Sequence, residues 1–174
     1  VDSNWKITGQ AQYGDDIRLP GELIGKILRS PHHYAKIRSI DVSAAEAMDG
    51  VFAVATGQDS VNKFGVLPVT KDEHAMAQDK VRHVGDLVAC VCAIDEATAI
   101  EAMNAISVDY EVLPSIHDME DGLKDSENPI HDRGKYHIGE SNVQKRVFQQ
   151  FGDLDGMKKA PYVHESDWET AGLH

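Results

Sequence analysis

The clearest hydrophobic pattern lies in the middle of the chain. Residues 87–94 form a continuous apolar run, which is typical of a strand that is covered on both faces. Asp95 can cap a helix that follows this run, and one helical face would then carry the apolar positions Ala99, Ala102, Met103 and Ile106. Over residues 106–112 apolar and polar positions alternate, which predicts a half-buried strand. Strand, helix and strand in this order predict a βαβ unit with a right-handed crossover.

Shorter apolar runs upstream predict three more strands, over residues 23–28, 35–42 and 51–55. Ser43 and Glu46 have the spacing of a capping box, in which the two side chains satisfy free N–H groups at a helix start. The helix that they begin must be short, because Gly50 supplies a stop. The residues alone therefore predict one soluble domain of mixed α and β structure.

The remaining segments are less regular. Residues 118–145 are polar and carry scattered glycines, so we expect an extended connector there. Residues 162–170 alternate weakly and could form an edge strand whose neighbours are missing. The chain starts at Val1 rather than Met and ends inside this pattern, so we expect both ends to be boundaries cut from a longer protein.

The net charge of the chain excludes some classes of binding partner. The formal net charge is −12, from 17 Lys and Arg against 29 Asp and Glu, and no basic run offsets it. Such a surface repels phosphate backbones and anionic lipid, so we expect neither nucleic-acid nor membrane binding. No apolar stretch approaches the roughly 20 residues that span a bilayer, and no signal-peptide pattern starts the chain.

The two cysteines, Cys90 and Cys92, lie two positions apart in the apolar run. On a strand they would point to the same face, where a disulfide between them is geometrically poor. An iron–sulfur cluster needs about four cysteine ligands, which exceeds what this chain offers. We therefore expect reduced core residues of a cytoplasmic protein.

No motif of catalysis or metal binding stands out. The nine histidines show neither the HExxH spacing nor a Cys–His finger pattern, so polar surface or interface roles are favoured over a metal site. They are His32, His33, His74, His83, His117, His131, His137, His164 and His174. The chain also lacks GxGxxG, Walker and GxSxG motifs, and the acidic pairs Asp15-Asp16 and Asp72-Glu73 are typical of a solvated face. The sequence thus predicts no catalytic, cofactor-binding or metal-binding residue.

Several segments in the same order resemble the start of the large subunit of the xanthine dehydrogenase/aldehyde oxidase family of molybdenum hydroxylases. They cover about two-thirds of the chain, and no single one of them is decisive. The segments are Lys6-Ile7-Thr8-Gly9, Leu19-Pro20-Gly21, Leu28-Arg29-Ser30-Pro31-His32, Ala35-Lys36-Ile37, Val54-Ala55-Thr56-Gly57, Lys80-Val81-Arg82 and Val108-Asp109-Tyr110-Glu111 with Leu113-Pro114. Within the family, residues 64–68 and 95–99 are most similar to the α subunit of 4-hydroxybenzoyl-CoA reductase. Asp86-Leu87 departs from the family's usual Glu-Pro.

The resemblance implies an α/β-hammerhead domain, a layered α+β unit with a mixed sheet and packed helices, over residues 1–120. Residues 121–174 would then be a connector and the first segment that leads into the molybdopterin-binding domain. The resemblance also implies molybdopterin bound outside this stretch, with 2Fe–2S and FAD in partner subunits or domains of an oligomer. Residues 29–34 are our candidate for contact with those neighbours, and an ordinary surface turn is the alternative.

Three functions remain open at this point. The chain could be part of a molybdenum-dependent oxidoreductase that acts on an aromatic acyl-CoA, an aldehyde or an N-heterocycle. It could instead be a free-standing scaffold module with the same fold, because a fold does not fix a function. A small metal-binding protein built on the histidines is the third.

Overall fold

The computed structural model describes residues 3–60, 62–65, 71–124, 127–131, 142–143, 147–168 and 170. Its main sheet has the strand order β1-β7-β3, and both pairs of strands are antiparallel. These strands are Ile24–Arg29, Leu87–Ala93 and Val51–Thr56 respectively. The continuous apolar run therefore forms the central strand, as its composition predicts for the most buried position in a sheet.

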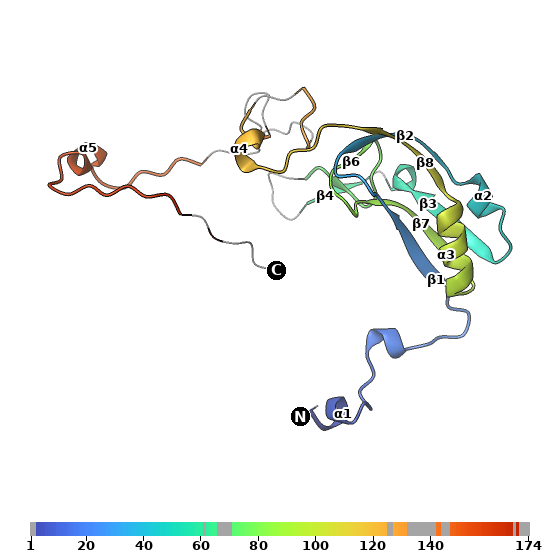
Figure 1. The fold of residues 1–174 in the computed structure, drawn as a ribbon. Helices are drawn as coiled ribbons and strands as arrows, with labels where there is room; N and C mark the ends of the chain where they lie inside the picture. The colour runs from blue at the N-terminus through green and yellow to red at the C-terminus, as the bar shows by residue number, and fades with distance from the viewer. Residues whose placement is uncertain are drawn as a thin grey trace.

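A second antiparallel sheet has the order β6-β2-β8 and lies beside the first (Figure 1). Its strands are Lys80–Val81, Ala35–Asp41 and Ser107–Val112. A short antiparallel pair, β4 (Lys63–Phe64) with β5 (Glu73–His74), completes the described strands. The α+β class is thus confirmed, and every strand pair in the described part of the chain is antiparallel, where a mixed sheet was predicted.

Helix α3 (Glu96–Ala105) confirms the predicted amphipathic helix. The Asp95 carboxylate accepts a hydrogen bond of 2.8 Å from the Thr98 N–H group and so caps the helix. Ala99 and Ala102 are fully buried. The helix packs against β1 and β7 and also contacts α2 (Ser43–Glu46). The small alanine side chains let the helix approach the sheet closely, and Ala102 belongs to the core cluster around Val91.

The predicted βαβ unit is wrong. Strands β7 and β8 flank helix α3 in the sequence, but they belong to different sheets. Both edges of β7 are already paired, with β1 on one side and β3 on the other. Because no edge of β7 is free, α3 carries the chain to the second sheet, where β8 pairs with β2.

The predicted capping box at the start of α2 is also wrong. Ser43 is the first residue of this helix, and no side chain caps it from the preceding position, Val42. The Asp41 carboxylate takes that role, because it accepts hydrogen bonds from the Ser43 N–H group at 3.0 Å and from the Ser43 hydroxyl at 2.6 Å. The helix is short, as predicted, but it ends at Glu46 with Ala47 as its C-cap, so the predicted stop at Gly50 is wrong. Gly50, with a φ of 86°, instead lies in the turn that leads into β3.

Cys90 and Cys92 are free thiols, as predicted, but both are only half-buried. Alternate residues of β7 face opposite sides of the sheet. The buried side carries Ala89, Val91 and Ala93. The prediction that the cysteines are core residues is therefore wrong, since they lie on the less covered face of the same strand.

The two ends of the chain extend away from the sheets (Figure 1). Among the described residues of these two ends, the regular structure consists of short helices, α1 (Ser3–Ile7), the 3-10 helix η1 (Gly14–Asp16), α4 (Met119–Gly122) and α5 (Leu154–Met157). A further 3-10 helix, η2 (Gly57–Asp59), follows β3. Within the described residues of the predicted edge strand, 162–168 and 170, the structure has no strand, so that prediction is wrong for this chain. In the part of the chain that the structure describes, no helix is long and apolar enough to cross a membrane.

Candidate functional site

The segment 29–34, predicted to contact neighbouring domains, is partly built into the core. The Ser30 and Tyr34 side chains are each only 3% exposed. The Ser30 N–H group donates to the Asp86 carbonyl at 2.9 Å, and the Gly85 N–H group donates to the Ser30 carbonyl at 2.8 Å. An ordinary surface turn would leave both side chains in solvent, so this segment is an anchored loop instead.

The two histidines of this loop face aromatic partners. The His32 ring meets Tyr110 edge-on with 4.9 Å between centroids, and the His33 ring meets His117 in the same way at 4.7 Å. Burial raises the pKa of Tyr110, and the charge of Asp86 adds to this rise while a hydrogen bond with Ser30 opposes it. Tyr110 therefore stays a neutral phenol at neutral pH.

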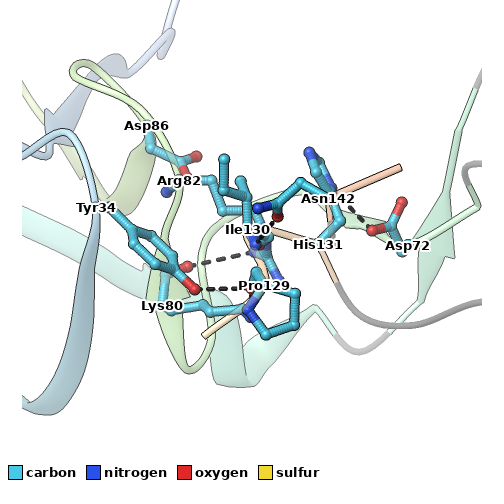
Figure 2. A network of polar contacts seen from close by, with 9 residues as sticks. All are labelled: Tyr34, Asp72, Lys80, Arg82, Asp86, Pro129, Ile130, His131 and Asn142. Carbon is cyan, nitrogen blue, oxygen red and sulfur yellow. Dashed lines mark hydrogen bonds and ion pairs between the residues drawn. The ribbon is translucent and has the colours of Figure 1, made fainter. Parts of the chain in front are cut away.

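Beside this loop, side chains in and next to the strands of the second sheet reach the segment that follows β8 (Figure 2). The Tyr34 hydroxyl donates to the Pro129 carbonyl at 2.7 Å, and the Lys80 ammonium group donates to the same carbonyl at 3.0 Å. The Arg82 Nε donates to the Ile130 carbonyl at 2.9 Å. These contacts join residues that are 48 to 95 positions apart in the sequence.

Two further contacts hold the same segment from other directions. The Ile130 N–H group donates to the Asn142 side-chain oxygen at 2.7 Å. The His131 Nδ1 lies 2.9 Å from an Asp72 carboxylate oxygen, and the Asp72 side chain is only 14% exposed. Asp72 lies just before β5, so this pair ties the β4–β5 region to the segment after β8.

A cleft of about 500 Å³ opens between these elements. Its lining mixes both signs of charge: Arg29, Asp72, Glu73, His74, Arg82, His83, Asp86 and His131, with apolar residues such as Phe64 and Leu87. The cations are already engaged, since Arg29 donates to the Gly85 carbonyl at 2.8 Å and Arg82 donates to Ile130. A phosphate-bearing cofactor such as molybdopterin would meet carboxylates and committed cations here, so the described residues do not fit that group.

The histidines are spread over separate environments. His83 lies 3.8 Å from Asp86, His164 is exposed in the C-terminal tail, and the Nδ1 of His74 is buried and has no hydrogen-bond partner among the described residues. His137 and His174 lie outside the described residues. Among the residues that are described, no three His, Cys, Asp or Glu side chains gather as metal ligands.

Sequence reasoning identified the 29–34 segment and missed Lys80, Arg82 and Asn142 as members of the network. No local pattern could have found them, because their partners are backbone carbonyl and N–H groups of a polar segment without periodicity. Lys80 and Arg82 have one signal, the Lys80-Val81-Arg82 match to the family, which does not state a role, and Asn142 has none.

The family pattern described as "Aldehyde oxidase and xanthine dehydrogenase, a/b hammerhead domain" matches residues 8–114. The chain is 35% identical over 171 residues to a probable xanthine dehydrogenase subunit of Bacillus subtilis, covering 97% of this chain and 22% of that protein. It is 35% identical over 176 residues to the nicotinate dehydrogenase large molybdopterin subunit of Eubacterium barkeri, covering 99% of this chain and 39% of that protein. The chain thus spans less than half the length of these relatives.

Solved structures share the fold. A crystal structure of the Cu,Mo-CO dehydrogenase superposes with a TM-score of 0.71 at 31% identity, over 91% of this chain and 21% of that chain. The aldehyde oxidoreductase of Desulfovibrio desulfuricans gives a TM-score of 0.74 at 27% identity, over 92% of this chain and 18% of that chain. Both similarities extend well past residues 8–114, because each covers more than nine-tenths of the chain.

Proposed function

The chain belongs to the aldehyde oxidase and xanthine dehydrogenase family and carries its a/b hammerhead domain, and from this premise we propose that it is the structural domain of a molybdopterin-binding subunit. The intact protein would carry out a two-electron redox reaction at molybdenum on an aromatic acyl-CoA, an aldehyde or an N-heterocycle. The 4-hydroxybenzoyl-CoA reductase type remains our candidate for the first of these. The observation that carries the proposal is the co-linear match over residues 8–114 together with the shared fold.

In this proposal the chain supplies scaffold and contributes no catalytic, cofactor-binding or metal-binding residue. The engaged cations and the carboxylates of the cleft support this division of labour. Residues 1–120 would be the hammerhead domain, and residues 121–174 would lead into the molybdopterin-binding part. Molybdopterin would perform the redox chemistry there, and the protein would orient it.

The proposed partners follow from the same division. We infer that 2Fe–2S and FAD domains or subunits complete an oligomeric enzyme in the cytoplasm, with no nucleic-acid or membrane partner. The net charge of −12 supports the last two points, and the two free cysteines agree with a reducing compartment. The loop of residues 29–34 stays our candidate for contact with these neighbours, through its exposed Arg29 and His33.

The test is elemental analysis of the native complex, captured from cell extract with an antibody against this chain. We expect molybdenum together with several iron atoms per copy, on a polypeptide far larger than 19.1 kDa. Capture in the presence of excess free chain serves as the control, because it removes specific binding.

A captured protein of about 19.1 kDa without molybdenum would contradict the proposal. It would favour the free-standing scaffold, to which the named relatives lend no support, since they are dehydrogenase subunits.

A further inference from the structure

Three donor groups converge on two successive carbonyl groups of the segment after β8. Tyr34 and Lys80 both donate to Pro129, and Arg82 donates to Ile130. The Tyr34 hydroxyl also lies 3.3 Å from the Asn128 carbonyl. Figure 2 shows these side chains pointing toward the segment from one side.

These donors stand on a rigid platform. Tyr34 immediately precedes β2, and Lys80 lies in β6, which pairs with β2 through Ala35 opposite Val81. The Tyr34 ring is almost fully buried, and the Lys80 ammonium group lies 5.9 Å from its centroid. The Tyr34 ring therefore cannot move far without disturbing the core.

The segment is also held through its remaining polar groups. The Ile130 N–H group donates to Asn142, and His131 pairs with Asp72. The main contacts from the core go to backbone carbonyls, which every residue type possesses. This arrangement recognises the path of the backbone, which bends at Asn128 and Ile130, rather than particular side chains.

We propose that Tyr34, Lys80 and Arg82 form a clamp that binds the backbone of residues 128–131 through hydrogen bonds and holds it in one register. The clamp thereby fixes the direction in which the chain leaves the core. The occupant is this segment of the same chain. The inference stands on these contacts alone and does not depend on the proposed enzyme function. In an intact multidomain protein, such a clamp would restrain the next domain more tightly than a flexible connector does.

The exchange rate of the Ile130 amide hydrogen tests the clamp, measured by NMR on the chain of residues 1–174. Tyr34→Phe removes one hydroxyl and keeps the buried ring, so we expect Ile130 to exchange about fivefold faster, the effect of one net hydrogen bond. Lys80→Met removes the second donor, and the double variant should exceed either single one. Tyr13→Phe and Lys6→Met change the same groups in the exposed N-terminal segment and should leave the rate unchanged.

Unchanged Ile130 exchange in both clamp variants, with the amides of β7 still protected, would overturn the proposal. Equal acceleration at Ile130 and throughout β7 in both variants would overturn it too, because the contacts would then support the whole fold and not one segment. Acceleration confined to residues 128–131 is the result that supports the clamp.

Discussion

The two sheets with α3 and the C-terminal tail of residues 147–168 use apolar side chains in opposite ways. In the sheets, Val88 and Val91 are at most 1% exposed. In the tail, Phe148 is 79% exposed and Trp168 is 89% exposed. Both regions are rich in apolar residues, so hydrophobic content alone does not make a core.

The difference lies in whether local structure presents those residues on one face. Strand alternation and the helical period bring the apolar positions of β7 and α3 together, where they exclude water. The tail has one short helix, α5, and otherwise no regular element within its described residues. Exposed apolar side chains of this kind mark surfaces that a neighbour covers, and under the proposed function the following domain is that neighbour.

The largest expected difference in stability comes from placing one charged residue in the core and another in the tail. Val91→Asp puts a carboxylate where the side chain is 1% exposed, and burial without a partner should cost at least about 3 kcal/mol of unfolding free energy. Val163→Asp makes the same change where the side chain is 72% exposed, and it should shift that free energy by less than about 0.5 kcal/mol. Urea denaturation of both variants measures the contrast, and similar losses in the two would refute it.

A medium loss of stability is expected when alanine replaces a glycine in the core region, and none when it replaces a glycine in the N-terminal segment. A Cβ added to Gly57 would collide with the Ala77 carbonyl group, so Gly57→Ala should cost about 2 kcal/mol through forced backbone movement. Gly14 in the N-terminal segment has no atom within 4 Å of such a Cβ, so Gly14→Ala is the matched control. Thermal unfolding compares the two, and a Gly57→Ala protein as stable as the parent would show that the close approach is not rigid.

A smaller effect on stability is expected from the protonation of Asp95 at low pH. The Thr98 backbone N–H group, with help from its hydroxyl, lowers the pKa of Asp95 in the folded chain. A carboxyl whose folded pKa is lowered stabilises the fold above its unfolded pKa of about 3.9, and this contribution disappears as pH falls through the folded pKa. Asp95→Asn should therefore lower the midpoint of thermal unfolding at pH 7 by about 2 °C and flatten its fall below about pH 4.

Asp153→Asn is the control in the tail, because Asp153 caps only the exposed helix α5. We expect no change in the midpoint at either pH. An unchanged pH profile in Asp95→Asn would show that the capping interaction does not stabilise α3.

The sequence predicted the elements whose hydrophobic pattern is local. Strands β1, β2, β3, β7 and β8 and helix α3 follow from periodicity, and the Asp95 cap follows from its position. The order of strands in the sheets could not be predicted, because it depends on which edges of β7 are already occupied. Local patterns also cannot show that Asp41 rather than a capping box serves α2.

Of the candidate site, only the loop of residues 29–34 could be predicted from the sequence. Ser30 and Tyr34 belong to a segment that the family resemblance picks out. Lys80 and Arg82 act on carbonyl groups 49 and 48 positions away, and backbone acceptors leave no trace in side-chain patterns. The tail strand was predicted from its alternation of apolar and polar residues. Among the described residues no strand pairs with it, and an isolated strand is not stable in water.

The central claim is that the sheets and α3 form a self-sufficient core and, under the proposed function, that the tail takes its order from the neighbouring domain of a larger enzyme. Hydrogen–deuterium exchange tests it most directly, by comparing the chain alone with the same residues in the native complex. We predict equal protection of β1, β7 and α3 in both samples and protection of residues 147–168 in the complex only. Equally fast exchange of the tail in both samples, or an unprotected β7 in the chain alone, would contradict the claim.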